Sequence, residues 1–347
     1  MSMFGNSGVL KEFSRKAVLS YARNRQPRTY LGPTLFPDNT VNELSFEYFK
    51  DRNLLPVMAS VQAFGTEARQ ASREGLDKVS GAIPTIKRKI PLNGRALIAL
   101  KREGAGDVEF VRNTLYNDLD NMIEACLARV EKMRMDAAAN GQIVLNENGV
   151  IMTVDYGVPA GNKEILSGTS LWSDSVNADP VGDIQRWANT VVGVSGIRPT
   201  RALTSNTVVA NLVKCMNVRK AIFGDNGGSR IVTLADVNAL LGSLELPRIV
   251  TYDEKVRVEA EDGTLSTERL FPEKKFVLLP GEALGETLVG PTEEALLDPE
   301  VDARDVAGVY AIVYQEPEPP VVWTKAAISA IPTFPMADAV FQAQVLA

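Results

Sequence analysis

The chain has 347 residues, of which 45% are hydrophobic and 23% are charged, a composition typical of folded proteins with two or three compact units. Its formal net charge is −6, which gives no overall attraction to nucleic acid or to anionic membranes. The sequence contains no histidine, which excludes His-based catalytic triads, HExxH zinc sites and imidazole acid–base catalysis.

Residues 8–24 carry apolar side chains at helical spacing with basic residues between them, which predicts a short amphipathic helix. Prolines 27, 33 and 37 predict an extended segment after it. The basic residues of this N-terminal arm are Lys11, Arg15, Lys16, Arg23 and Arg25. The arm could bind nucleic acid or lipid, or pack on a neighbouring surface as an inter-subunit arm. We favour the packed arm, because no aromatic stacking pattern accompanies the charges.

Residues 44–64 contain two runs typical of strands, LSFEYF and VMASVQAF. A polar segment follows at 65–81, and then the partly alternating run at 82–92, so the pattern predicts a protruding hairpin with a long charged tip. The charged tip residues are Glu67, Arg69, Arg73, Glu74, Asp77 and Lys78. They fit a solvated loop, or a contact with another subunit through complementary charges.

The stretch from Asp107 to Gly141 contains apolar residues at a mean spacing of about 3.6 residues, the period of an α-helix. We expect Asp107 to cap its start and Gly141 to end it. A helix at 107–140 is far longer than the usual length of about 11–12 residues, so we interpret it as the spine of an extended subunit.

Both cysteines of the chain lie in apolar helical patterns, Cys126 on the spine and Cys215 further along. We expect both to be buried small hydrophobes, which suits a reducing compartment. The start of the sequence lacks the apolar core of a signal peptide, and no apolar run is long enough to span a membrane. These features predict a soluble protein that is made inside the cell.

After the spine, Asn148-Gly149 between two apolar runs predicts a β-hairpin. From Pro180 the pattern alternates between helices and strands, which predicts a compact α/β unit of about 120 residues. We expect its helices to be capped by Asp179, Asn206 and Thr233, with Gly242 closing the last one.

The glycine-rich run at 223–230 lacks the spacing and the GK[ST] of a phosphate-binding loop, and we interpret it as a loop tip. The tail contains the proline-rich turn 316–320 and then strand-like residues. We expect these strands to pair beside the spine, so that the α/β unit is an insertion into a discontinuous spine domain.

No catalytic constellation is evident, and we expect no enzyme activity, no cofactor and no metal site. The acidic runs at 259–263 and 291–305 lack the spacing of a calcium loop. Acidic residues are plentiful, so a carboxylate-dependent hydrolase stays open as an alternative. The arm, hairpin and spine indicate an elongated protein that associates with itself.

The order of these parts resembles the major capsid proteins of tailed phages, which have the Hong Kong ninety-seven fold, and it is most similar to the lambda-like major capsid protein E family. The landmarks are DPVGDIQRWAN (179–189), FVLLPGEALGETLVG (276–290) and FQAQVLA (341–347), and their order and spacing carry the resemblance.

The resemblance implies an α+β capsid fold with an N-terminal arm, an extended β-hairpin loop, a spine helix, a peripheral domain and an inserted α/β axial domain. The expected parts are the arm at 1–40, the start of the peripheral domain at 41–56, the extended loop at 57–95, the peripheral domain at 96–160 and 306–347, and the axial domain at 161–305. The loop Gly224, Asp225, Asn226, Gly227 and Gly228 would then lie at the centre of each capsomer.

The resemblance also implies that the chain self-assembles into hexamers and pentamers that form the icosahedral head of a tailed double-stranded DNA phage. Its implied partners are further copies of itself, a separate scaffolding protein, the portal and a decoration protein. The shell would enclose DNA without sequence-specific binding and without a membrane, and it would be assembled in the host bacterial cytoplasm. An encapsulin-like nanocompartment shell is the alternative with the same fold.

Overall fold

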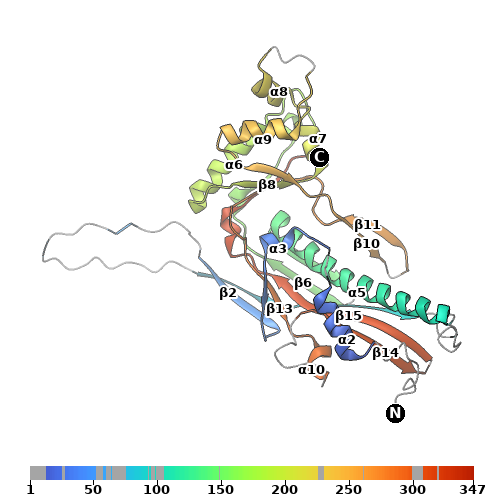
Figure 1. Cartoon of the computed structure of the whole chain (residues 1–347). Helices are drawn as coiled ribbons and strands as arrows, with labels where there is room; N and C mark the ends of the chain where they lie inside the picture. The colour runs from blue at the N-terminus through green and yellow to red at the C-terminus, as the bar shows by residue number, and fades with distance from the viewer. Residues whose placement is uncertain are drawn as a thin grey trace.

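A computed structural model describes residues 13–25, 28–51, 58, 59, 64, 76–92, 94, 98, 105–147, 149–225, 230–260, 262–298, 308–318 and 320–347. Its parts are arranged around one long helix, α5 (Ala105–Asn140, 36 residues), which runs beside a twisted sheet (Figure 1). A second unit of helices and strands lies beyond the C-terminal end of α5. Within the described residues, no helix has the length and the apolar character needed to cross a membrane.

The predicted spine helix is confirmed, because the side chains of its apolar stripe are buried wherever they are described. Leu115, Leu119, Cys126 and Ala137 have no exposed surface. Gly141 follows the helix with φ 69°, the left-handed conformation expected of a residue that ends a helix. The prediction that Asp107 caps the start is wrong, because the helix already begins at Ala105.

The sheet beside α5 is formed by segments that are far apart in the sequence. Its strands are β1 (Asp38–Thr40), β13 (Thr287–Gly290), β15 (Pro320–Pro332) and β14 (Tyr310–Pro317) in that order, with β4 (Thr85–Leu92) also paired to β15. β1 and β13 are parallel, and the other pairs are antiparallel. The expected return of the C-terminal strands to the spine is therefore confirmed. We call this sheet together with α5 the spine unit.

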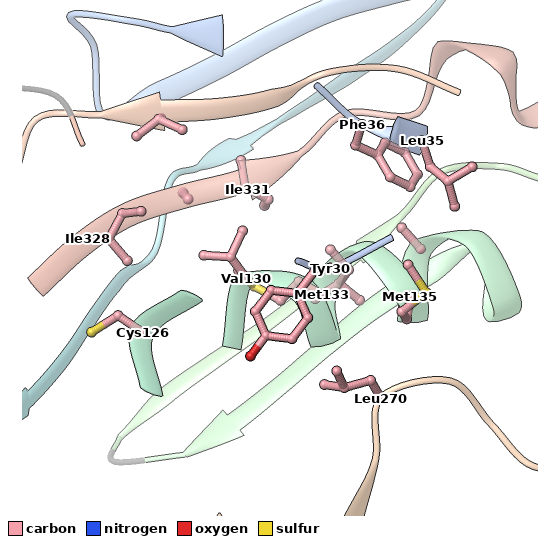
Figure 2. Close-up of a cluster of buried hydrophobic side chains, with 14 of the residues drawn as sticks. Tyr30, Leu35, Phe36, Cys126, Val130, Met133, Met135, Leu270, Ile328 and Ile331 are labelled. Atoms are coloured by element: carbon pink, nitrogen blue, oxygen red, sulfur yellow. The ribbon is translucent and has the colours of Figure 1, made fainter. Parts of the chain in front are cut away.

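The core of the spine unit lies between α5 and β15. Figure 2 shows Val130 and Met133 of α5 directed toward Ile328 and Ile331 of β15. Phe36, from the N-terminal part of the chain, joins the same cluster and is fully buried. Because distant segments contribute to one apolar core, burial of this surface holds the discontinuous unit together.

The second unit, which we call the α/β unit, has a sheet of five strands within the described residues. Its strands, in spatial order, are β7 (Lys163–Ile165), β16 (Phe341–Gln344), β12 (Lys275–Leu279), β8 (Arg201–Thr204) and β9 (Arg248–Thr251). Its helices are α6 (Pro180–Ser195), α7 (Asn206–Leu212), α8 (Met216–Phe223) and α9 (Leu234–Ser243). Trp172, Trp187 and Phe276 pack together on the helical side of the sheet. Leu203 and Val277 belong instead to the core of the spine unit, so the two units share apolar contacts.

The helix ends of the α/β unit follow the sequence signals in part. Asp179 caps α6, and Thr233 caps α9 with a capping box, as predicted. The cap of α7 is Ser205 rather than Asn206, because the side chain of Ser205 accepts the free N–H of Val208. Gly242 does not close α9, which continues to Ser243.

Where the chain is described, three two-stranded sheets accompany the two larger ones: β2 (Ser45–Asp51) with β3 (Leu76–Ala82), β5 (Gln142–Glu147) with β6 (Val150–Asp155), and β10 (Lys255–Glu259) with β11 (Leu265–Arg269). The predicted hairpin after the spine is confirmed by β5 and β6. The remaining elements of the described residues are α2 (Arg15–Asn24), α3 (Gly32–Leu35), α10 (Glu293–Leu297) and the short 3-10 turns Ala160–Asn162, Gly168–Ser170 and Pro335–Ala339.

Strand pairing changes three of the expected boundaries. The terminal strand β16 lies inside the α/β sheet, although 306–347 was assigned to the peripheral domain. Strand β13 belongs to the spine unit, although 161–305 was assigned to the axial domain. The extended hairpin begins at β2, before residue 57, while β4 returns to the spine sheet. These partners lie far away in the sequence, so local patterns do not reveal them.

Candidate assembly surfaces

The N-terminal arm is folded onto its own chain in the described residues. Ser14 caps α2 by accepting the N–H of Ala17, and α2 packs against β14. The rings of Phe13 and Tyr21 lie 4.7 and 5.1 Å from that of Tyr116 on α5. The apolar side of the predicted amphipathic helix therefore covers the spine unit.

Three acidic residues of α5 form hydrogen bonds or ion pairs with polar groups of the N-terminal segment. Asp120, Glu124 and Glu131 are spaced by four and seven residues, which places them along one side of the helix. The Arg25 guanidinium lies 3.4 Å from Asp120 Oδ1 and 3.2 Å from Glu124 Oε2. The Tyr30 hydroxyl donates to Glu124 Oε1 at 2.7 Å. We call Asp120, Glu124 and Glu131 the acidic stripe.

The acidic stripe binds Arg25 within the chain, because its side chain is only 14% exposed and is paired with Asp120 and Glu124. The sequence signal that could have revealed this is the spacing of the three acids beside the apolar stripe. Lys16 is exposed, and Arg15 and Arg23 lie within α2. Lys11 lies outside the described residues. An inter-subunit role for the arm residues stays a prediction.

Glu131 forms the most buried part of this contact. Its Oε1 accepts two hydrogen bonds, from the Gly32 backbone N–H at 2.9 Å and from the Tyr252 hydroxyl at 2.8 Å. Arg134 lies 3.6 Å from Glu131 Oε2, pairs with Asp38, and donates to the Thr287 hydroxyl at 2.8 Å. Burial raises the pKa of Glu131, although its two donors and Arg134 act in the opposite direction. This cluster joins four separate segments, so no local pattern in the sequence indicates it.

The extended hairpin is described at its base. Glu67, Arg69, Arg73 and Glu74 lie outside the described residues, whereas Asp77 and Lys78 lie in β3 rather than in a loop tip. Lys78 is half-exposed and pairs with Glu47 of β2 at 2.7 Å. The chain thus binds the Lys78 charge within its own hairpin, and an inter-subunit role for these six residues stays a prediction.

The loop expected at the capsomer centre follows α8, at the end of the α/β unit away from the spine (Figure 1). Gly224 ends α8 with φ 71°, and the Asp225 carboxylate is exposed and lies 3.7 Å from Lys220 Nζ. Asn226, Gly227 and Gly228 lie outside the described residues. The structure therefore places the start of this loop on an exposed tip.

The described residues contain no group of three or more Asp, Glu or Cys side chains that could hold a metal ion. Both cysteines are buried, as predicted. Burial raises the pKa of Cys126 to about 12 and that of Cys215 to about 11, so both are thiols at neutral pH.

The sequence matches the model of one protein family, and several solved structures are similar to the chain. The phage major capsid protein E family matches residues 15–345. A protein assigned as a prophage capsid protein of E. coli CFT073 has a similar structure, with a TM-score of 0.61, 15% identity and coverage of 99% of this chain and 100% of that chain. A phage-related protein from Bordetella bronchiseptica RB50 has a TM-score of 0.52 and 15% identity over 95% of this chain and 96% of its own. No curated protein matches the sequence.

The match to the family extends across both units, from α2 to the residue after β16. It supports the phage capsid interpretation over the encapsulin alternative, and the structural neighbours share the fold at low sequence identity. The chain therefore belongs to the phage major capsid protein E family and has the Hong Kong ninety-seven capsid fold.

Proposed function

We propose that this major capsid protein assembles into hexamers and pentamers, which close into the icosahedral head of a tailed phage around double-stranded DNA. The observation that carries the proposal is the family match over residues 15–345, which covers both units and the spine between them. The α/β unit is then the axial domain near each capsomer centre, and the spine unit is the peripheral domain.

The shape of the chain supports self-association. The sheet of β2 and β3 has no third strand among the described residues, so its outer backbone groups stay available for pairing. We propose that the hairpin lies over a neighbouring subunit, with Glu67, Arg69, Arg73, Glu74, Asp77 and Lys78 near the contact.

Several partners follow from this proposal. A separate scaffolding protein directs assembly in the host bacterial cytoplasm, the portal occupies one vertex, and a decoration protein binds the outer surface. The net charge of −6 favours weak contact with the enclosed DNA, because non-specific affinity comes mainly from Lys and Arg near phosphates. The role is structural, without catalysis.

Sedimentation velocity combined with electron microscopy tests the proposal. The chain is expressed with and without the scaffolding protein of its phage. We expect closed shells of uniform size with the scaffold, and irregular particles, tubes or free capsomers without it. A chain that stays monomeric or dimeric under both conditions would refute the proposal. Hydrolytic turnover by such a small species would support the carboxylate-dependent hydrolase instead.

A further inference from the structure

Residues 28–38, which we call the strap, cross the chain where the spine unit meets the α/β unit. At the start of the strap, Arg28 pairs with Glu254 of the α/β unit. Two residues later, Tyr30 donates to Glu124 of α5, and Gly32 donates to Glu131 of α5. Within five residues, the strap thus contacts both units.

The far end of the strap is attached to the spine sheet. Asp38 pairs with Arg134 of α5. Thr287 of β13 donates its N–H to Pro37 at 2.8 Å and its hydroxyl to the Phe36 carbonyl at 2.9 Å. Phe36 and Leu35 are buried. The end near Asp38 is therefore fixed to the sheet. The part from Arg28 to Gly32 lies along α5, where Tyr30 and Leu31 pack against the apolar core and polar groups bond the acidic stripe.

One carboxylate oxygen connects the strap to the α/β unit. Glu131 Oε1 accepts from Gly32 of the strap and from Tyr252, which follows β9. Glu131 is fully buried, so its carboxylate depends on hydrogen bonds to offset the loss of water. Loss of either donor would leave it with fewer of them. Two segments that do not follow each other in the sequence thus share the same buried acceptor.

The units also contact each other away from the strap. Leu203 and Val277 of the α/β sheet pack on the spine core, and the Gln342 side chain donates to the Ala138 carbonyl at 2.8 Å. Apolar contacts are non-directional and tolerate small rotations, whereas hydrogen bonds to a buried carboxylate do not. Directional contacts between the units among the described residues thus include Glu131 with its two donors, the Gln342–Ala138 bond and the Arg88–Glu259 pair of β4 with β10. Of these, the contact at Glu131 is the one that also receives a donor from the strap.

We propose that the strap is a latch, so that the α/β unit changes its angle to α5 only when residues 28–32 lift from the acidic stripe. Release of the strap removes the Arg28–Glu254 pair and the Gly32 bond together, which leaves the Tyr252 hydroxyl as the remaining donor to Glu131 Oε1. The inference concerns the single chain and does not rest on shell assembly.

Tyr30→Phe in the unassembled full chain tests the coupling, because the Tyr30 hydroxyl bonds α5 and not the α/β unit. Hydrogen exchange at the Gly32 amide reports release of the strap. Spin labels at Asn121→Cys on α5 and Ser243→Cys on α9, both exposed positions, report the distance between the units. The native cysteines are buried and stay unlabelled. Tyr310→Phe is the matched control, since its hydroxyl bonds Asp298 at 2.8 Å away from the strap.

We expect Tyr30→Phe to raise exchange at Gly32 about tenfold, as for a lost buried hydrogen bond, and to broaden the distance distribution between the labels. Tyr310→Phe should change neither. Gly32→Ala should raise exchange at residue 32 and broaden the distance distribution more than Tyr30→Phe does, because the added methyl group would clash with Glu131. A strap that exchanges faster with an unchanged distance distribution would overturn the latch, and so would unchanged exchange at Gly32 in both strap variants.

Discussion

Gly32 is a glycine because another chain segment approaches it closely, and not because its backbone needs a positive φ. A Cβ at this position would lie 2.1 Å from Glu131 Oε2 and 2.5 Å from Arg134 Cδ. Both neighbours are buried and bonded to other segments, so they have little room to move. The absence of a side chain lets the strap reach the acidic stripe.

Gly32→Ala should lower the free energy of unfolding by about 1–3 kcal/mol, because the methyl group overpacks the buried pair. Gly193→Ala is the matched control, since it lies within α6 with nothing within 4 Å of its Cβ. The control should gain about 0.5–1 kcal/mol from helix propensity. Urea unfolding measures both. Equal stability of Gly32→Ala and the parent chain would contradict the close approach.

Glu131 gives the chain a specific pH dependence. Its folded-state pKa is raised above the ordinary 4.5, so the folded chain holds this proton more tightly than the unfolded chain. The contribution to stability is fully present below the ordinary pKa and is lost as the pH rises through the raised pKa. Glu131→Gln keeps an acceptor for Gly32 and Tyr252, so its stability relative to the parent should increase with pH.

Urea midpoints at pH 5 and pH 8 measure this difference. Glu131→Ala is the contrasting variant, and it should cost about 2–4 kcal/mol at both pH values because two buried donors lose their acceptor. If the difference in urea midpoint between Glu131→Gln and the parent chain stays constant with pH, burial does not set the pKa of this carboxyl group.

The caps at Asp179 and Thr233 could be predicted because each capping bond spans three residues of sequence. The partners of Arg25 and Gly32 could not be predicted. Gly32 and Glu131 are 99 residues apart, and the contact depends on how the strap folds back along α5. Local patterns showed charge on both segments, but they do not show which charges meet.

The last strand, β16, lies between β7 and β12 in the α/β sheet rather than at an edge. It is parallel to β7 and antiparallel to β12. Phe341 is buried, and its ring lies 5.3 Å from that of Trp187. The C-terminal segment therefore completes the α/β unit, although the rest of that unit comes from the middle of the chain.

Deletion of 341–347 should unfold the α/β unit, because it removes a central strand and Phe341 from the core. Loss of one buried Phe side chain alone costs about 3–5 kcal/mol. Deletion of Ala347, which is exposed, is the control and should have no effect. Near-UV circular dichroism detects the change through Trp172 and Trp187, both fully buried. If the variant that lacks 341–347 kept the native tryptophan signal, β16 would not be needed for the fold of the α/β unit.

Elements with strong local periodicity were predicted well, and α5 and the β5–β6 hairpin are the clearest cases. The partner of β16 and the parallel pairing of β1 with β13 were not predicted. Short strands of three or four residues contain little pattern, and their neighbours are chosen by the packing of the whole sheet. Local patterns therefore do not show which sheet each of these short strands joins.

The described part of the chain is elongated, with the α/β unit beyond one end of the spine (Figure 1). In a single copy the surfaces of this elongated shape have no neighbours, whereas in a closed lattice every subunit makes the same set of contacts. The capsid interpretation could be reached from the sequence because the order of arm, hairpin, spine and insertion is itself informative. The contacts between copies depend on surfaces that the single chain does not define.

Replacement of residues 67–75 by a short Gly/Ser link should leave the melting temperature nearly unchanged and abolish shell assembly. The segment is too polar to supply a core, so its removal should cost the single chain about 0.5 kcal/mol or less. A contact of about 1 kcal/mol becomes decisive when every subunit repeats it. Arg129→Gln is the control, because it removes a charge that is paired within the chain, with Glu147 of β5, and it should still assemble. Normal shells from the link variant would exclude an inter-subunit role for the loop.

Cryo-electron microscopy of particles formed with the scaffolding protein gives the most direct test of the proposed function. We predict closed icosahedral shells in which six or five copies surround each capsomer axis. The α/β unit should lie nearest the axis, with Gly224 and Asp225 facing it, and the extended hairpin should lie over a neighbouring copy. Particles without this symmetry, or shells with the spine unit at the capsomer axis, would contradict the assignment.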